Sequence, residues 1–188
     1  SIQQISALMF CGVVGLMIPG LQPLLLGALA EEGRVSANQL GVVATAELLT
    51  MGLTAGIAGS LLKASRLKLT ATAALITLAV LDAITPSARG PMIMLVRAAA
   101  GIPSGILVWI TIAFIARTPT PERWAGAYVT AQTLGQFIGV AIVTAFIAPR
   151  FGADGGFIAL ATLCAASIAV TPLLPRELAP LPAAATAG

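Results

Sequence analysis

Residues 92–116 read MIMLVRAAAGIPSGILVWITIAFIA, and this stretch decides the fold. A helix needs about 20 apolar residues to cross the hydrocarbon core of a bilayer. The stretch is longer than that and holds a single charged side chain, Arg97. A surface helix of a soluble protein would instead carry polar residues along one face. We therefore predict that residues 92–116 form a transmembrane helix.

Five other segments share this character. Charged residues make up 9% of the 188 residues, against about 25% in soluble domains, and the mean hydropathy is +1.00. Turn and cap residues separate the segments, and Ser36 is a good N-cap for the second. The predicted spans are residues 5–29, 40–62, 67–84, 92–116, 124–147 and 156–174. We expect an all-α integral membrane protein with a six-transmembrane-helix bundle over residues 1–174.

Loop charges predict the orientation of these helices, because Lys and Arg are enriched in cytoplasmic loops. Six of them lie on one side of the predicted bundle and three on the other. The first group is Lys63, Arg66, Lys68, Arg117, Arg123 and Arg176, and the second is Arg34, Arg89 and Arg150. Both termini should therefore be cytoplasmic. Residues 175–188 are rich in Pro and Ala and are predicted to be a tail or linker.

Several kinds of chemistry are excluded or disfavoured by composition. The chain has no histidine, which removes imidazole metal sites and Ser-His catalysis. We find no nucleophile–base pair, metal cluster or phosphate loop, so we expect no enzyme activity and no cofactor. The sequence has no basic patch interleaved with aromatic residues, so we do not expect nucleic acid as a partner. Cys11 and Cys164 sit inside apolar runs, which favours small buried residues over a disulfide.

Three polar side chains share one depth in the predicted bundle. Gln22, Glu47 and Arg97 lie on three different spans, with Glu47 and Arg97 roughly 8–10 Å below the outer edge at 1.5 Å per residue. They could converge on one cavity, where Glu47 would alternate between Arg97 and a proton. A buried ion pair that only fixes the helix register is an equal alternative. Asp82, near the outer end of the third span, is predicted to reach headgroup water.

Other interior polar residues leave two interpretations open. Gln132 and Gln136 lie one turn apart on one face of the fifth span, where they could line a cavity or join helices. Trp109 could line a substrate cavity or pack against lipid.

Small residues and prolines predict how the helices pack. Small-x-x-x-small spacing, which lets helices approach closely, occurs at Gly52/Gly56, Gly101/Gly105 and Gly135/Gly139. Pro19 and Pro23 in the first span and Pro103 in the fourth predict two interrupted helices. Matching breaks in the first helices of two successive triplets are typical of a 3+3 inverted repeat and favour a binding site nearby.

The run Arg97-Ala-Ala-Ala-Gly101-Ile-Pro-Ser-Gly105 is similar to the R-x-x-x-G-x-x-x-G motif of the major facilitator superfamily, and the first span, ending Pro19-Gly-Leu-Gln-Pro23, resembles the family's drug and metabolite exporters. The resemblance covers residues 5–174 and corresponds to the N-terminal six-helix half. It implies alternating-access transport of a small organic solute, coupled to protons through the motif arginine, in a cell membrane such as the bacterial inner membrane.

The loop between the second and third spans departs from the family pattern. The family's gating loop, G-x-x-x-D-R-x-G-R-K, corresponds here to Gly59 through Lys68, with Lys63 at the Asp position and Arg66 at the second Gly position. In the family, this Asp helps to latch the closed arrangement.

One half needs a partner besides membrane lipid, because its polar face would otherwise meet lipid. A second six-helix half, a homodimer and another membrane protein all fit. The alternative function is a non-transporting scaffold or assembly subunit with a transporter-like fold.

Overall fold

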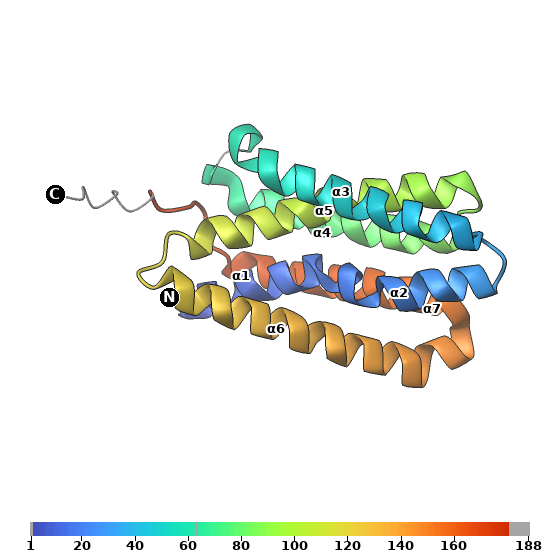
Figure 1. The fold of residues 1–188 in the computed structure, drawn as a ribbon. Helices are drawn as coiled ribbons and strands as arrows, with labels where there is room; N and C mark the ends of the chain where they lie inside the picture. The colour runs from blue at the N-terminus through green and yellow to red at the C-terminus, as the bar shows by residue number, and fades with distance from the viewer. Residues whose placement is uncertain (1, 63, 181–188) are drawn as a thin grey trace.

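The computed structural model describes residues 2–62 and 64–180, and within these ranges the chain is helical and has no β-strand (Figure 1). The α-helices are α1 (Ile2–Gly15), α2 (Met17–Glu31), α3 (Ala37–Leu61), α4 (Leu67–Ile84), α5 (Pro91–Ile115), α6 (Pro121–Ile142) and α7 (Ala148–Ser167). Short segments join or extend them: the 3-10 helices η1 (Ala64–Arg66), η2 (Thr85–Ser87) and η4 (Ile168–Leu173), and the π-helical η3 (Val143–Ile147). The all-helical prediction is confirmed, as is Ser36 as the N-cap of α3.

Five helical segments are long and apolar enough to cross a membrane, as a multi-pass membrane protein requires. They are Ile2–Glu31, Ala37–Leu61, Leu67–Ser87, Pro91–Ile115 and Pro121–Leu173. The last has 53 residues, about 80 Å of straight helix against a hydrocarbon core of about 30 Å. It bends back on itself near Gly152, whose φ is 58° (Figure 1). Six crossings remain a prediction.

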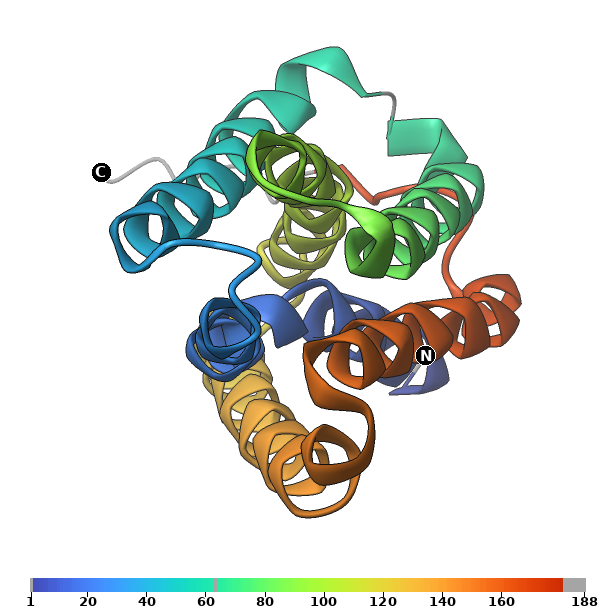
Figure 2. The same ribbon diagram turned by 90° about the vertical axis from the view of Figure 1, so that its right-hand side faces the viewer.

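The helices form two groups that pack face to face. Figure 2 shows α3, α4 and α5 on one side, and α1, α2, α6 and α7 on the other. Two buried apolar clusters fill the interior, one containing Leu8, Leu75 and Leu107 and the other Leu25, Ile93 and Phe157. Both cysteines are free and buried in the first cluster, as predicted.

The two ends of the bundle have different contents. The connection between α2 and α3, the turn between α4 and α5, and the bend at Gly152 within α7 meet at one end, which we call the Arg34 end (Figure 1). The start of α1 and residues 174–180 lie at the opposite end, which we call the terminal end.

The first predicted span is broken at Leu16. Leu16 has φ −105° and ψ 11°, and it separates α1 from α2. Pro19 has no N–H to donate to the carbonyl of Gly15. It lies instead in the first turn of α2, where helix N–H groups have no partner within the helix.

The predicted interruption at Pro103 is wrong, because α5 runs unbroken from Pro91 to Ile115. A neighbouring helix can stabilise a transmembrane helix through a proline, and α3 packs along α5 here. Gly101 and Gly105 are the contact points, since a Cβ on either would overlap backbone atoms of α3. With no matching break in α5, the inverted repeat remains a prediction.

The start of the predicted tail packs across the terminal end. The backbone N–H of Leu67 donates to the carbonyl oxygen of Arg176 at 3.2 Å, and Arg117 Nε donates to that of Ala179 at 2.7 Å. Leu178 is buried in the apolar cluster around Leu75. Residues 174–180 therefore close this end of the bundle, and residues 181–188 lie outside the described ranges.

Candidate functional site

Arg97 of α5 lies at the centre of a buried polar cluster. Its Nε donates to Glu47 Oε2 at 3.1 Å, its Nη2 pairs with Glu47 Oε1, and its Nη1 donates to Asp82 Oδ1 at 2.6 Å. The guanidinium thus binds one carboxylate of α3 with two nitrogens and a second carboxylate of α4 with the third. Glu47 and Arg97 are 0% exposed and Asp82 is 2% exposed.

Three further side chains complete the surroundings of this ion pair. Gln22 of α2 donates its Nε2–H to Glu47 Oε2 at 3.1 Å. Thr85 of η2 accepts a hydrogen bond from Arg97 Nη1 on its Oγ1 at 3.2 Å. The ring of Phe157 of α7 lies 5.0 Å from the guanidinium carbon, within the range of a cation–π interaction. We call Gln22, Glu47, Asp82, Thr85, Arg97 and Phe157 the Arg97 cluster.

Close packing of α3 on α5 positions the bidentate pair. A Cβ on Gly101 would overlap the backbone oxygen of Glu47 and the Oγ1 of Thr50. Thr50 Oγ1 also donates to the carbonyl oxygen of Ala98 on α5 at 2.6 Å. Because the backbones touch one turn from Arg97, the Glu47 side chain reaches the guanidinium without crossing open space.

The cluster carries an imbalance of charge. Two carboxylates and one guanidinium sum to a formal charge of −1 when both carboxyl groups are ionised. Each ion removed from water costs several kcal/mol unless it is paired. One proton on either carboxyl group would make the cluster neutral.

Three members of the Arg97 cluster were predicted from the sequence to lie close together, and Asp82 was predicted to lie elsewhere. Gln22, Glu47 and Arg97, predicted at one depth, are in contact. The prediction that Asp82 reaches headgroup water is wrong, because Asp82 is buried against Arg97. The connection between α4 and α5 is short, so the two helices are antiparallel neighbours and Asp82 lies across from Arg97. This short connection could have predicted the contact from the sequence. The same signal applies to Thr85.

The other predicted cavity residues lie away from the Arg97 cluster. Gln136 of α6 donates its Nε2–H to the carbonyl oxygen of Leu16 at 2.6 Å, so it joins α6 to the break between α1 and α2. Gln132 is half-buried one turn earlier on α6. Trp109 is half-buried beside Gly59 of α3 and packs on the apolar cluster around Leu75.

The predicted packing pairs differ in their contacts. A Cβ on Gly139 would meet Met17 and Leu21, and one on Gly135 would meet Val13, so this pair contacts the first span. In contrast, Gly52 and Gly56 have no atom within 4 Å of an added Cβ.

The residues predicted to form a gating loop lie at the terminal end. Lys68 Nζ donates to the carbonyl oxygen of Pro172 at 2.5 Å, and Arg66 ends η1. Lys63 lies outside the described ranges.

Comparison of the sequence with protein-family models gives no match, and comparison with curated proteins gives no significant match. We therefore infer the function of the chain from the geometry and charge of the Arg97 cluster and from the surfaces around it.

Proposed function

We propose that this chain is one half of a membrane transporter that moves a small organic solute by alternating access, with transport coupled to protons. The Arg97 cluster is the observation that carries the proposal. Charged side chains inside membrane spans are rare, because they are costly there, and they mark ion and substrate pathways. Each of the five apolar candidate spans contributes a side chain to this cluster.

The charge count supports a specific coupling step. If Glu47 releases Arg97 and takes up a proton, the guanidinium still has Asp82 as a partner. Glu47 is then neutral, and the remaining pair sums to zero. Asp82 thus prevents the release of Glu47 from leaving a buried cation unpaired, which would be costly. The proton taken up by Glu47 thus replaces its ion pair with Arg97, which stays paired with Asp82.

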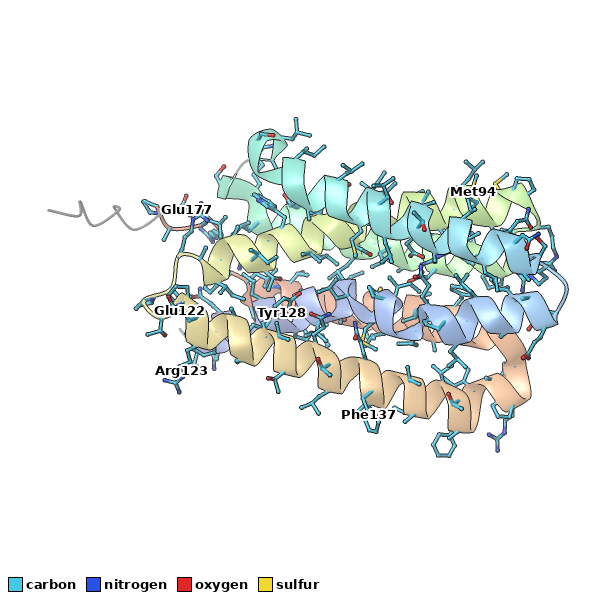
Figure 3. The ribbon with its side chains drawn as sticks, viewed as in Figure 1. Met94, Glu122, Arg123, Tyr128, Phe137 and Glu177 are labelled. Carbon is cyan, nitrogen blue, oxygen red and sulfur yellow. The ribbon has the colours of Figure 1, made fainter. Side chains whose placement is uncertain are left out.

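The outer faces of α3 and α6 support the need for a partner. Only 11% of the most apolar part of α3 is buried, and Leu53 and Ile57 are more than half exposed. On α6, Phe137 is 71% exposed and points away from the bundle (Figure 3). These faces fit a second six-helix half or a second copy, with lipid covering the rest.

The proposal includes six crossings, with α6 and α7 as the fifth and sixth, and the 3+3 repeat of the resembling family. Both termini would face the cytoplasm across a bacterial inner membrane, so that the Arg34 end would be the outer end. The distribution of Lys and Arg supports this orientation.

Proteoliposomes loaded with a pH-sensitive dye test the proposal. A panel of amphipathic amines, sugars and organic acids is added to vesicles under a pH gradient, and proton movement is recorded. We expect at least one solute to drive proton flux through the wild-type chain or its reconstituted dimer. Glu47→Gln should abolish that flux, whereas the control Glu122→Gln should retain it, because Glu122 lies at the exposed start of α6 (Figure 3). Unchanged pH dependence in Glu47→Gln would remove the coupling role.

A membrane scaffold is the second candidate, and the unpaired face of α3 favours it equally, since a scaffold also presents an apolar helix to a partner. A photo-crosslinker at Leu53 in native membranes would separate the two. Crosslinks to an unrelated protein, with no solute flux in vesicles, would favour the scaffold.

A further inference from the structure

Arg34, in the connection between α2 and α3, ties three segments of the Arg34 end together. Its Nη2 donates to three backbone oxygens of the turn between α4 and α5: Pro86 at 2.6 Å, Thr85 at 3.2 Å and Ala88 at 3.3 Å. Its Nη1 forms ion pairs with Asp154 of α7 and with Glu32. The side chain is only 7% exposed, although it comes from a connecting loop.

Glu32 also links the connection between α2 and α3 to α7. Its Oε1 accepts a hydrogen bond from the backbone N–H of Ala153 at 2.9 Å, directly after the bend at Gly152. A carboxylate at the start of a helix segment compensates unpaired N–H groups there. The two acids remain accessible, since the Glu32 and Asp154 side chains are 35% and 49% exposed. Arg34 therefore lies between water-facing carboxylates and a buried turn.

Thr85 connects this closure to the Arg97 cluster. Its carbonyl oxygen accepts from Arg34, and its Oγ1 accepts from Arg97 Nη1 at 3.2 Å. The same hydroxyl donates to the carbonyl oxygen of Leu81 at 2.8 Å, which fixes its orientation. Thr85 is 0% exposed. One residue thus separates a guanidinium at the end of the bundle from the buried one.

We propose that Arg34 is a positioning residue for the Arg97 cluster: acting through Thr85, it holds the Arg34 end closed and keeps water from Asp82 and Glu47. The Nε–H of Arg34 is buried and has no hydrogen-bond partner among the described residues. A buried donor without a partner costs free energy, so the closed arrangement does not use the full bonding capacity of this arginine. Opening would let Nε reach water. The role in transport rests on the proposed function, but the closure can be measured without transport.

Arg89 provides a matched control at the same end. Its Nη1 donates to two of the same carbonyl oxygens, Pro86 at 2.8 Å and Ala88 at 2.9 Å. Unlike Arg34, it forms no ion pair with Asp154 and no bond to Thr85 among the described contacts. Loss of either arginine removes one positive charge and hydrogen bonds to this turn, three for Arg34 and two for Arg89. Only the loss of Arg34 also removes an ion pair to Asp154 of α7.

Carboxyl footprinting of the full chain in lipid nanodiscs tests the inference. The protein is treated with a water-soluble carbodiimide and glycine ethyl ester, and modification of each carboxyl group is measured by mass spectrometry. In the wild type, Asp82 and Glu47 should react far less than Glu122. Arg34→Gln should raise the modification of Asp82 by about tenfold, because losing a charged hydrogen-bond partner shifts a local opening equilibrium by at least that factor. Arg89→Gln should stay near the wild-type value.

Asp154→Asn is the second variant and covers the case in which Arg34→Gln fails to fold. It removes one ion pair and leaves the carbonyl bonds of Arg34 in place, so Asp82 modification should rise by a smaller factor. Unchanged modification of Asp82 in the folded variants would overturn the inference, as would an equal rise in Arg89→Gln. If Asp82 modification rises in Arg34→Gln but the wild type shows no solute flux, the role of Arg34 in closing the Arg34 end stands and the transport function is rejected.

Discussion

Replacing Arg97 with methionine should destabilise the protein far more than neutralising either carboxylate. The wild-type cluster has a formal charge of −1, and Arg97→Met would change it to −2 and leave no cation within the cluster. Glu47→Gln or Asp82→Asn would instead bring the charge to zero. Each variant removes only one ionised group. Arg97→Met nevertheless increases the net buried charge, whereas either carboxylate variant removes it.

The magnitude follows from the burial of the cluster. Breaking a buried ion pair by removing one partner costs about 3–5 kcal/mol, and Arg97 has two such partners with side chains no more than 4% exposed. At about 2–4 °C per kcal/mol for a domain of this size, the unfolding temperature should fall by roughly 6–20 °C. The deficit should shrink as the pH falls, because each proton bound removes one uncompensated charge.

Thermal unfolding in a mild detergent, followed by circular dichroism, measures this effect. Arg123→Met is the matched control, because Arg123 is exposed at the start of α6 and points away from the bundle (Figure 3). The triple variant Glu47→Gln/Asp82→Asn/Arg97→Met should recover most of the lost stability, since neutral replacement of a buried ion network is often tolerated. An unfolding temperature of Arg97→Met equal to that of Arg123→Met would refute the reasoning.

Two other substitutions test the packing around the site. Gly101→Ala should lower the unfolding temperature, because its Cβ would overlap the backbone of Glu47. The control Gly56→Ala has open space around it, so its stability should be unchanged or rise by up to about 1 kcal/mol from helix propensity. Equal effects of the two would argue against close packing of α3 on α5. Gln136→Leu should lower the unfolding free energy by about 0.6 kcal/mol, which is typical of an interhelical hydrogen bond in a membrane protein. Gln132→Leu should lower it by less, and steric-trapping measurements of the unfolding free energy would show the difference.

The helical class and much of the Arg97 cluster could be predicted from sequence because apolar length and interior charge are local signals. Arg97 and Glu47 stand out as charges within apolar runs, whatever their neighbours. Asp82 lies near the end of its run, where sequence position alone cannot separate headgroup water from a partner on the next helix.

Other features depend on tertiary contacts that no local pattern encodes. The bonds of Arg34 reach the turn after α4 and the start of α7, which lie far away in the sequence. Gln136 binds a backbone oxygen that only the break at Leu16 makes available. Pro103 was expected to interrupt α5, but the packing of α3 along the same stretch stabilises the helix through it.

The described chain enters and leaves the bundle at the same end (Figure 1). A tandem duplication of this segment at the DNA level would therefore join two copies in the same orientation, with a linker on one side and no added crossing. An inverted second copy would need an extra helix to bring the chain across. The geometry of the ends thus makes a parallel repeat the shortest evolutionary route from one such bundle to a fused pair.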